Sequence, residues 1–235
     1  MSNLALSVIL PAFDEARRLP SYLEAIRAYL AGGDQPCEVI VVDDGSRDAT
    51  AAVVADMARQ WPQLRLLRHT RNQGKGAAVR TGVLAAEGEL LLFADADGAT
   101  PIEEISRLDA AIAAGADMAV GSRLVPDADI QRSRHWYRGL TGRLFAATAR
   151  RLLGIEIRDT QCGFKMFRTE AARRLFAAVA EERYLFDLEL LLLAQRLQLK
   201  VIEVPIRWHE VSGGHMHPLA ELPRILAGLW RLRRR

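Results

Sequence analysis

Two aspartates, Asp95 and Asp97, stand one residue apart directly after an apolar run at residues 90–93. In an extended chain, residues i and i+2 face the same way, so both carboxylates can converge where a strand ends. Converging carboxylates repel each other unless a cation lies between them, and Mg²⁺ or Mn²⁺, held also by substrate phosphates, suits that arrangement. A solvated turn is the alternative, because Asp-x-Asp-Gly is common in loops.

Three further apolar runs are each followed by a polar cluster. These clusters lie at residues 11–15, 43–46 and 121–123. Ligands of parallel α/β proteins bind at the carboxyl ends of the strands. Four clusters at one edge of a sheet therefore predict a site, where one alone would predict a turn. Asp43 and Asp44 offer carboxylates to a base or a ribose, and an Asp-Gly turn with a helix cap is the alternative for one of them.

A lysine and two glycines open a helical pattern at residues 71–76, whose sequence is Arg-Asn-Gln-Gly-Lys-Gly. Backbone N–H groups at a helix N-terminus attract phosphate, so Lys75 and this turn suit a diphosphate. The spacing of the glycines and the lysine is not that of a P-loop.

The elements that must position these residues alternate between strands and helices. Short runs rich in apolar and β-branched residues predict strands at residues 6–10, 38–42, 64–67, 89–94 and 117–120. Between them, apolar residues recur at helical spacing, as at Leu19, Leu23 and Ile26. This alternation is typical of βαβ units, so we expect an α/β fold with a mostly parallel sheet flanked by helices.

The second half of the chain is less regular. We expect helices at residues 136–153 and 187–197, and strands at 163–167 and 200–206, the last with Pro205 favouring an edge position. A final helical stripe of apolar residues runs from Leu219 to Trp230 and is followed by arginines. Because no linker rich in Pro, Gly or Ser separates the halves, we expect one domain over residues 1–218 and an amphipathic, basic C-terminal helix over 219–235.

The composition excludes several classes of protein. The 235 residues carry a net charge of +3 and 6% aromatic residues, too little basic and aromatic surface for binding nucleic acid. The two cysteines, Cys37 and Cys162, lie far apart and have no metal-ligand spacing. No apolar run reaches the roughly 18–20 residues of a membrane-spanning helix, so we expect a cytoplasmic protein.

Taken in order, these motifs resemble those of the inverting family 2 glycosyltransferases. The resemblance is closest to the dolichyl-phosphate β-glucosyltransferases and their bacterial polyprenyl-phosphate relatives, and it implies the GT-A (Rossmann-like) fold. It is carried by residues 8–15, 41–46, 72–77, 94–100, 121–123, 158–165 and 186–189. Its specific part is the combination of Asp95-Ala-Asp-Gly-Ala-Thr100 with Asp159-Thr-Gln-Cys-Gly-Phe-Lys165.

The resemblance implies a nucleotide-sugar donor and gives each motif a part in binding it. The nucleotide pocket is implied to comprise Pro11, Ala12, Phe13, Glu15, Asp43, Asp44 and Ala96. Asp95 is implied to contact the ribose or the metal, and Asp97 the Mg²⁺ or Mn²⁺ ion that bridges the diphosphate. Lys75 is expected on the leaving diphosphate.

The acceptor phosphate is implied to lie against Arg123, Arg132 and Arg134, with Asp159 as a candidate for orienting it. Related mannosyl-transferring enzymes carry a glutamine metal ligand two residues after the second aspartate. This chain has Ala99 there, which argues against the mannosyl branch and leaves that metal ligand without a counterpart. The resemblance points to UDP-glucose as the donor, with UDP-linked amino sugars, UDP-galactose and GDP-mannose as the alternatives.

A polyprenyl phosphate acceptor would explain why the sequence has no clear copy of the family's Glu-Asp base motif. The second pKa of a phosphomonoester is about 6, so the acceptor is already largely dianionic at neutral pH, whereas a sugar hydroxyl needs a general base. We expect direct displacement with inversion, giving a β-linked lipid-phosphate sugar. The alternatives are a sugar hydroxyl acceptor, with Asp159, Asp187 or Glu189 as base, and a non-catalytic protein that binds nucleotide sugars.

The C-terminal helix combines an apolar stripe, a tryptophan and clustered arginines, as helices that lie on anionic membranes do. The alternative is a docked helix that ends in a solvated basic tail. We expect a peripheral protein at the inner face of a membrane, where its acceptor lies.

Overall fold

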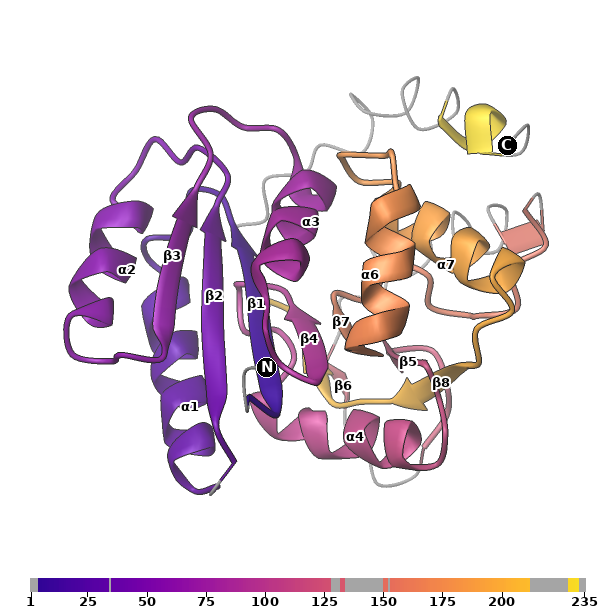
Figure 1. Cartoon of the computed structure of the whole chain (residues 1–235), viewed down its shortest axis with the longest axis horizontal. Helices are drawn as coiled ribbons and strands as arrows, with labels where there is room; N and C mark the ends of the chain where they lie inside the picture. The colour runs from indigo at the N-terminus through magenta and orange to yellow at the C-terminus, as the bar shows by residue number, and fades with distance from the viewer. Residues whose placement is uncertain are drawn as a thin grey trace.

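The computed structural model describes residues 4–33, 35–127, 132–133, 150–151, 153–211 and 228–232. At its centre is a seven-stranded sheet in the order β3-β2-β1-β4-β7-β5-β8 (Figure 1). Its strands are β1 (Leu6–Ala12), β2 (Cys37–Asp43), β3 (Leu64–Arg68), β4 (Leu90–Ala94), β5 (Met118–Ser122), β7 (Phe164–Arg168) and β8 (Val201–Pro205). A smaller parallel sheet pairs β6 (Arg132–Ser133) with β9 (Trp208–His209).

The large sheet is parallel apart from β7. β1 pairs in parallel with both β2 and β4, β2 with β3, and β5 with β8. β7 runs antiparallel between β4 and β5. β2 and β3 lie on one side of β1 in the sheet, whereas β4 lies on its other side. The strand order therefore reverses at β1, and sheets of this kind bind ligands at such a switch point.

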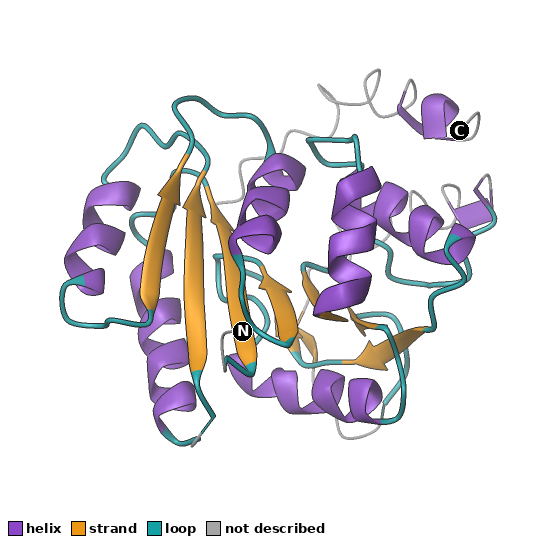
Figure 2. Ribbon diagram, in the orientation of Figure 1, coloured by secondary structure: helices purple, strands orange, loops and turns teal. Residues whose placement is uncertain are grey.

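Helices cover both faces of this sheet (Figure 2). They are α1 (Leu19–Ala31), α2 (Thr50–Ala58), α3 (Lys75–Ala85), α4 (Ile105–Ala113), α6 (Thr169–Ala178) and α7 (Phe186–Arg196), with a 3₁₀ turn, η1 (Ile102–Glu104), before α4. Successive strand residues face opposite ways, so neighbours belong to different cores. Ile9 belongs to the core that includes residues of α3, α6 and α7, whereas Val8 belongs to the core that includes residues of α1, α2 and α4.

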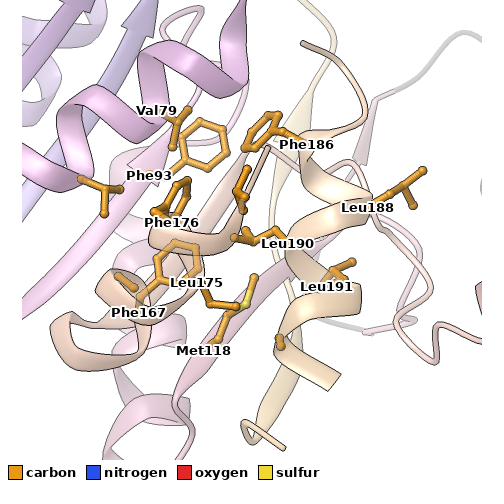
Figure 3. Packing of buried hydrophobic residues seen from close by; sticks show 14 of the residues in the cluster. Val79, Phe93, Met118, Phe167, Leu175, Phe176, Phe186, Leu188, Leu190 and Leu191 are labelled. Atoms are coloured by element: carbon orange, nitrogen blue, oxygen red, sulfur yellow. The ribbon is translucent and has the colours of Figure 1, made fainter. Parts of the chain in front are cut away.

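Aromatic side chains fill the core under α3, α6 and α7 (Figure 3). Phe93 of β4 meets Phe186 of α7 edge to face, with ring centres 5.9 Å apart. Phe167 of β7 meets Phe176 of α6 in the same way at 6.0 Å. These contacts fix α6 and α7 to the middle of the sheet, beside β4, which ends just before Asp95.

The strands predicted from the sequence are confirmed, each boundary lying within two residues of the observed one. β8 is an edge strand, as Pro205 predicted. The helix expected at residues 187–197 is α7. The helix expected at 136–153 lies mostly outside the described residues, as do residues 219–227 and 233–235 of the expected C-terminal helix.

The described part of that last helix, residues 228–232, packs on the body of the protein. Leu229 and Leu232 are buried in the core that contains α7, and Arg231 pairs with Glu181 at 2.9 Å. Trp230 is 56% exposed. Leu229 and Leu232 are therefore docked on the protein, as the docked-helix alternative expects. The division of the chain at residue 218 stays a prediction. Among the described residues, every helix is too short or too polar to cross a membrane.

Close packing of α3 on β1 gives the first testable prediction. A Cβ at Gly82 would overlap Cγ2 of Ile9, which is completely buried. We expect Gly82→Ala to lower the free energy of unfolding by about 1–2 kcal/mol, because overpacking outweighs the gain in helix propensity. Urea denaturation measures the change.

Gly32→Ala is the matched control, because a Cβ there would lie 3.5 Å from its nearest neighbour, an ordinary contact. It should change the unfolding free energy by less than about 0.5 kcal/mol. Equal effects of the two substitutions would contradict the tight α3–β1 packing.

Candidate active site

The carboxyl ends of β1, β2, β4 and β5 bring the four polar clusters to one edge of the sheet. β1 ends at Ala12 and β2 at Asp43, whereas β4 and β5 end just before Asp95 and Arg123. The arrowheads of β2 and β3 mark this edge at the top of Figure 1. The clusters after β1 and β4 therefore flank the switch point, where a ligand is expected.

Asp95 and Lys75 form an ion pair at the centre of this edge. Lys75 Nζ lies 2.6 Å from Asp95 Oδ1, and the two side chains are 32% and 38% exposed. The ammonium also lies 5.1 Å from the centre of the Phe93 ring, within the range of a cation–π contact. Burial alone would lower the pKa of Lys75, but the charges of Asp95 and Asp187 outweigh it and hold that pKa above its ordinary value. Lys75 is therefore a permanent cation.

Asp97 lies beside Asp95 and turns back onto the loop that follows it. Its Oδ1 accepts a hydrogen bond from the backbone N–H of Ala99 at 3.0 Å. Burial, and next the negative charge of Asp95, raise the pKa of Asp97 above its ordinary value. A cation bound between these two carboxylates would remove their repulsion.

The two aspartates fit a divalent ion that takes its remaining ligands from elsewhere. In the part of the chain that the structure describes, no group of three or more His, Cys, Asp or Glu side chains could enclose a metal. Mg²⁺ is usually held in this way, by one or two carboxylates together with substrate phosphates and water. The donor set suits Mg²⁺ or Mn²⁺ bound together with a phosphate ligand.

The position of the Asp95 carboxylate depends on Gly163, the residue before β7. The backbone N–H of Asp95 donates to the carbonyl oxygen of Gly163 at 2.8 Å. A Cβ at Gly163 would overlap the carboxyl group of Asp95. Any other residue there would displace that carboxylate, so this position requires glycine for close approach rather than for backbone freedom.

Hydrogen bonds lock the loop after β1 to the loop after β2. The backbone N–H of Asp14 donates to Ser46 Oγ at 2.9 Å, and that of Glu15 donates to Thr50 Oγ1 at 2.8 Å. The Glu15 side chain accepts from Arg18 Nε at 2.7 Å. These bonds hold two of the predicted nucleotide-pocket segments in a fixed relation.

The other residues predicted for the nucleotide pocket differ in exposure. Pro11 and Phe13 are partly exposed, whereas Ala12 and Ala96 are buried. Ala12 accepts a hydrogen bond at its carbonyl from the backbone N–H of Asp44. Buried alanine side chains give a ligand little surface to touch, so Ala12 and Ala96 can shape the pocket mainly through their backbone.

Asp43 and Asp44 are buried, and both organise loops of the site. Asp43 Oδ1 accepts from the backbone N–H of Ser46 at 3.0 Å, as in the predicted turn, and Oδ2 accepts from Arg68 Nε at 3.1 Å. Asp44 accepts the backbone N–H groups of Gln73 and Gly74 at 2.9 and 2.8 Å. Asp44 therefore fixes the turn that leads into α3 and Lys75.

Arg123 is held by Asp159 through a two-pronged ion pair. Its Nε and one Nη lie 2.7 and 2.8 Å from the two carboxyl oxygens, and its backbone N–H donates to the same group at 2.8 Å. Burial alone would raise the pKa of Asp159, but the charge of Arg123 outweighs it and the pKa lies below its ordinary value. The guanidinium also lies 5.5 Å from the ring centre of Trp208.

The other predicted arginines are only partly placed. The backbone of Arg132 pairs with Trp208 in the β6–β9 ribbon, next to the ring that Arg123 contacts. His209 in β9 donates its backbone N–H to the carbonyl of Ala99, which ties this ribbon to the loop after Asp97. Arg134 lies outside the described residues.

Sequence reasoning missed several residues of the site. Tyr184 lies close enough to Lys75, Arg123 and Asp95 for their charges to act on its hydroxyl. Lys165 and Gly163 belong to a recognised motif but were given no role. Their position in the motif at residues 158–165 was the signal that could have found them. A motif indicates that a residue is important, but not which other residues it contacts.

Comparison with known proteins agrees with the fold and the motifs. The model of the family described as "Glycosyl transferase family 2" matches residues 7–176. A dolichyl-phosphate beta-glucosyltransferase of Drosophila melanogaster is 40% identical over 244 residues, which span 97% of this chain and 75% of that protein. The enzyme of the same name from Homo sapiens is 34% identical over 251 residues, 97% of this chain and 78% of the human protein.

Solved structures share the architecture. Glucosyl-3-phosphoglycerate synthase from Mycobacterium tuberculosis, in complex with Mn²⁺, UDP-glucose and phosphoglyceric acid, superposes with a TM-score of 0.69 at 22% identity, covering 98% of this chain and 80% of that one. The same synthase is also known with Mg²⁺ and UDP, at a TM-score of 0.70. At such identity the likeness shows the GT-A fold alone. The family match and the curated relatives go further, and by them the chain belongs to glycosyl transferase family 2.

Proposed function

We propose that this protein transfers glucose from UDP-glucose to the phosphate of a polyprenyl phosphate, with inversion at the anomeric carbon. Relatives that are 34–40% identical over nearly the whole chain bear the name dolichyl-phosphate beta-glucosyltransferase. The proposal also requires a site that binds the donor's diphosphate and the acceptor's phosphate and removes no proton from the acceptor.

The observation that carries the proposal is that the three carboxylates considered as a base, Asp159, Asp187 and Glu189, each already bind another partner among the described residues. Asp159 gives both oxygens to Arg123. Asp187 is buried against Lys165, and Glu189 accepts the backbone N–H groups of residues 180 and 181 at 2.9 and 2.6 Å. A hydroxyl acceptor needs a base that can take its proton, whereas a phosphate dianion does not.

On the donor side, Asp95 and Asp97 would hold the divalent ion, which would supply positive charge to the leaving diphosphate. Lys75 places a second cation next to Asp95. The N-terminus of α3, with its positive end, would face the diphosphate as well. Asp44 keeps the turn before Lys75 in place. These groups stabilise charge that grows on the diphosphate as its bond to the sugar breaks.

On the acceptor side, Arg123 positions the incoming phosphate. A guanidinium has five N–H donors, and Asp159 uses two of its side-chain nitrogens, which leaves donors for a second anion. An oxygen of the acceptor phosphate attacks the anomeric carbon while the diphosphate leaves from the opposite side. The product is a β-linked lipid-phosphate sugar together with UDP.

The same reading makes the protein peripheral to a membrane, since its acceptor is a lipid. Trp230 is 56% exposed on a helix whose Leu229 and Leu232 are anchored in the core. Tryptophan favours the interface between water and lipid. We therefore place this helix at the cytoplasmic face of a membrane, with Trp230 in contact with lipid.

Transfer itself is the first test. Protein incubated with Mn²⁺, a short-chain polyprenyl phosphate and a panel of radiolabelled nucleotide sugars should move label from UDP-glucose into the organic phase. EDTA should abolish the transfer. Asp97→Asn should lower the rate at least about 100-fold, because a neutral amide is a poor ligand for a hard cation.

Asp56→Asn is the matched control for Asp97→Asn, because Asp56 is exposed and pairs with Arg59 on α2. It should leave the rate unchanged. Label that enters a soluble sugar instead of the lipid would contradict the acceptor, and an α-linked product would contradict inversion.

The Arg123–Asp159 pair is tested through the Michaelis constants of the two substrates. Arg123→Lys and Asp159→Asn should each raise the KM for the lipid phosphate about tenfold or more, because a two-pronged donor is lost or loosened. The KM for UDP-glucose should change by less than about threefold. The double variant should be little worse than the poorer single variant, because one removes the partner of the other.

Arg65→Lys, at the opposite end of the sheet, is the control and should leave both constants unchanged. If Arg123→Lys raised the KM for UDP-glucose and left that for the lipid unchanged, Arg123 would belong to the donor side.

Contact of Trp230 with lipid is tested by sedimentation with vesicles that contain anionic lipid. Trp230→Ala should lower the bound fraction several-fold, because it removes an interfacial anchor. Leu84→Ala is the matched control, since Leu84 is also 56% exposed but lies on α3. Equal partitioning of both variants and the wild type would rule out a membrane contact at Trp230.

A further inference from the structure

A lysine and an aspartate form a buried ion pair beneath the site, and neither has a part in the proposed transfer. Lys165, in β7, has no exposed surface, and Asp187, in the first turn of α7, is 3% exposed. Lys165 Nζ lies 2.5 Å from Asp187 Oδ1. The same ammonium donates to the carbonyl oxygen of Cys162 at 2.5 Å.

Stability alone does not account for such a pair. Removing two charges from water is so unfavourable that a buried ion pair often gives a fold no more stability than two apolar residues of similar size. The surroundings here are apolar and well packed, with Phe93 and Phe186 in edge-to-face contact (Figure 3). Replacing the pair by two apolar residues should therefore cost the fold little stability.

The bond from Lys165 to Cys162 reaches the acceptor side of the site. Cys162 lies in the turn that carries Asp159, the partner of Arg123, and Gly163, which abuts the carboxylate of Asp95. The charge of Lys165 also helps to lower the pKa of Asp159. Fixing the carbonyl of Cys162 therefore fixes the turn from which both Arg123 and Asp95 take their positions.

The bond from Lys165 to Asp187 reaches the donor side. The charge of Asp187 acts on Lys75, next in strength to that of Asp95. Both ammonium groups lie against the same ring, Lys75 at 5.1 Å and Lys165 at 5.7 Å from the centre of Phe93. Asp187 thus helps to hold Lys75 next to Asp95, while the contact with Lys165 holds Asp187 in place.

We infer that Lys165 and Asp187 are positioning residues that set the donor-side and acceptor-side groups of the site relative to each other. The inference rests on the proposed function, which defines the donor side and the acceptor side. Its donor-side part requires only that the site binds UDP with a divalent ion. Neither residue touches a substrate in this scheme, and each acts through Lys75, Asp95 or Arg123.

The test compares paired and single substitutions at the two positions. Lys165→Met/Asp187→Leu replaces the pair by apolar residues and should keep the melting temperature within a few degrees of the wild type. It should still weaken binding of UDP in the presence of Mn²⁺, measured by calorimetry, by about tenfold or more, because Lys75 and Asp95 lose their fixed relation. Asp187→Asn alone should weaken UDP binding and also lower the melting temperature, because it leaves a buried ammonium without its counter-ion.

Glu38→Gln is the control, because Glu38 is a buried carboxylate that pairs with Arg65 at the far end of the sheet. It should lower the melting temperature and leave the affinity for UDP unchanged. A double variant that is stable and binds UDP like the wild type would overturn the inference. So would a double variant that melts more than about 10 °C lower, since the pair would then serve folding.

The outcome for the proposed function is read separately. If the wild type binds UDP with Mn²⁺ but transfers nothing to polyprenyl phosphate, the proposed acceptor is wrong, and the UDP affinities still decide the donor-side part of the inference. If it does transfer, the double variant should in addition show a raised KM for the lipid phosphate.

Discussion

Several carboxylates gather at one edge of the sheet and repel one another. The other groups of the site are arranged so that they offset this repulsion. Asp43 and Asp44 are balanced by backbone N–H groups and by basic side chains, and Asp95 is balanced by Lys75. Asp97 is balanced least, and burial together with Asp95 raises its pKa. An added cation would therefore stabilise the site most if it bound beside Asp97. For this reason the geometry favours a divalent ion there over a second, purely structural ion pair.

The one reversed strand of the large sheet supplies what the parallel strands cannot. Parallel strands bring only their carboxyl ends to the edge where the site lies, whereas β7 runs the other way and begins there. The turn before β7 therefore contributes its own residues: Asp159, which holds Arg123, and Gly163, which sets the position of Asp95. Because β7 lies between β4 and β5, this turn joins the aspartates after β4 to the arginine after β5.

The sequence predicted the strands, the edge position of β8 and the gathering of four clusters, because each of these follows from local pattern and from the rules of parallel sheets. It did not predict the direction of β7, since an apolar run looks the same in either direction. Nor did it predict the partners of Arg123 and Lys75, because Asp159 and Asp95 are 36 and 20 residues away along the chain. Asp187 and Glu189 were left open between base and structure for the same reason, as burial among partners cannot be read from spacing.

Charge balance also bears on the role expected for Arg132 and Arg134. A loaded site would hold a diphosphate and a phosphate dianion beside Asp95, Asp97 and Asp159, and these negative charges outnumber a divalent ion, Lys75 and Arg123 together. Coulomb energies at a partly screened site are about 4 kcal/mol for charges 4 Å apart, so such an excess would keep the acceptor out. The backbone of Arg132 lies opposite Trp208, the residue against which Arg123 rests. The acceptor therefore needs further positive charge, which gives a physical reason for the expectation that Arg132 and Arg134 contact its phosphate.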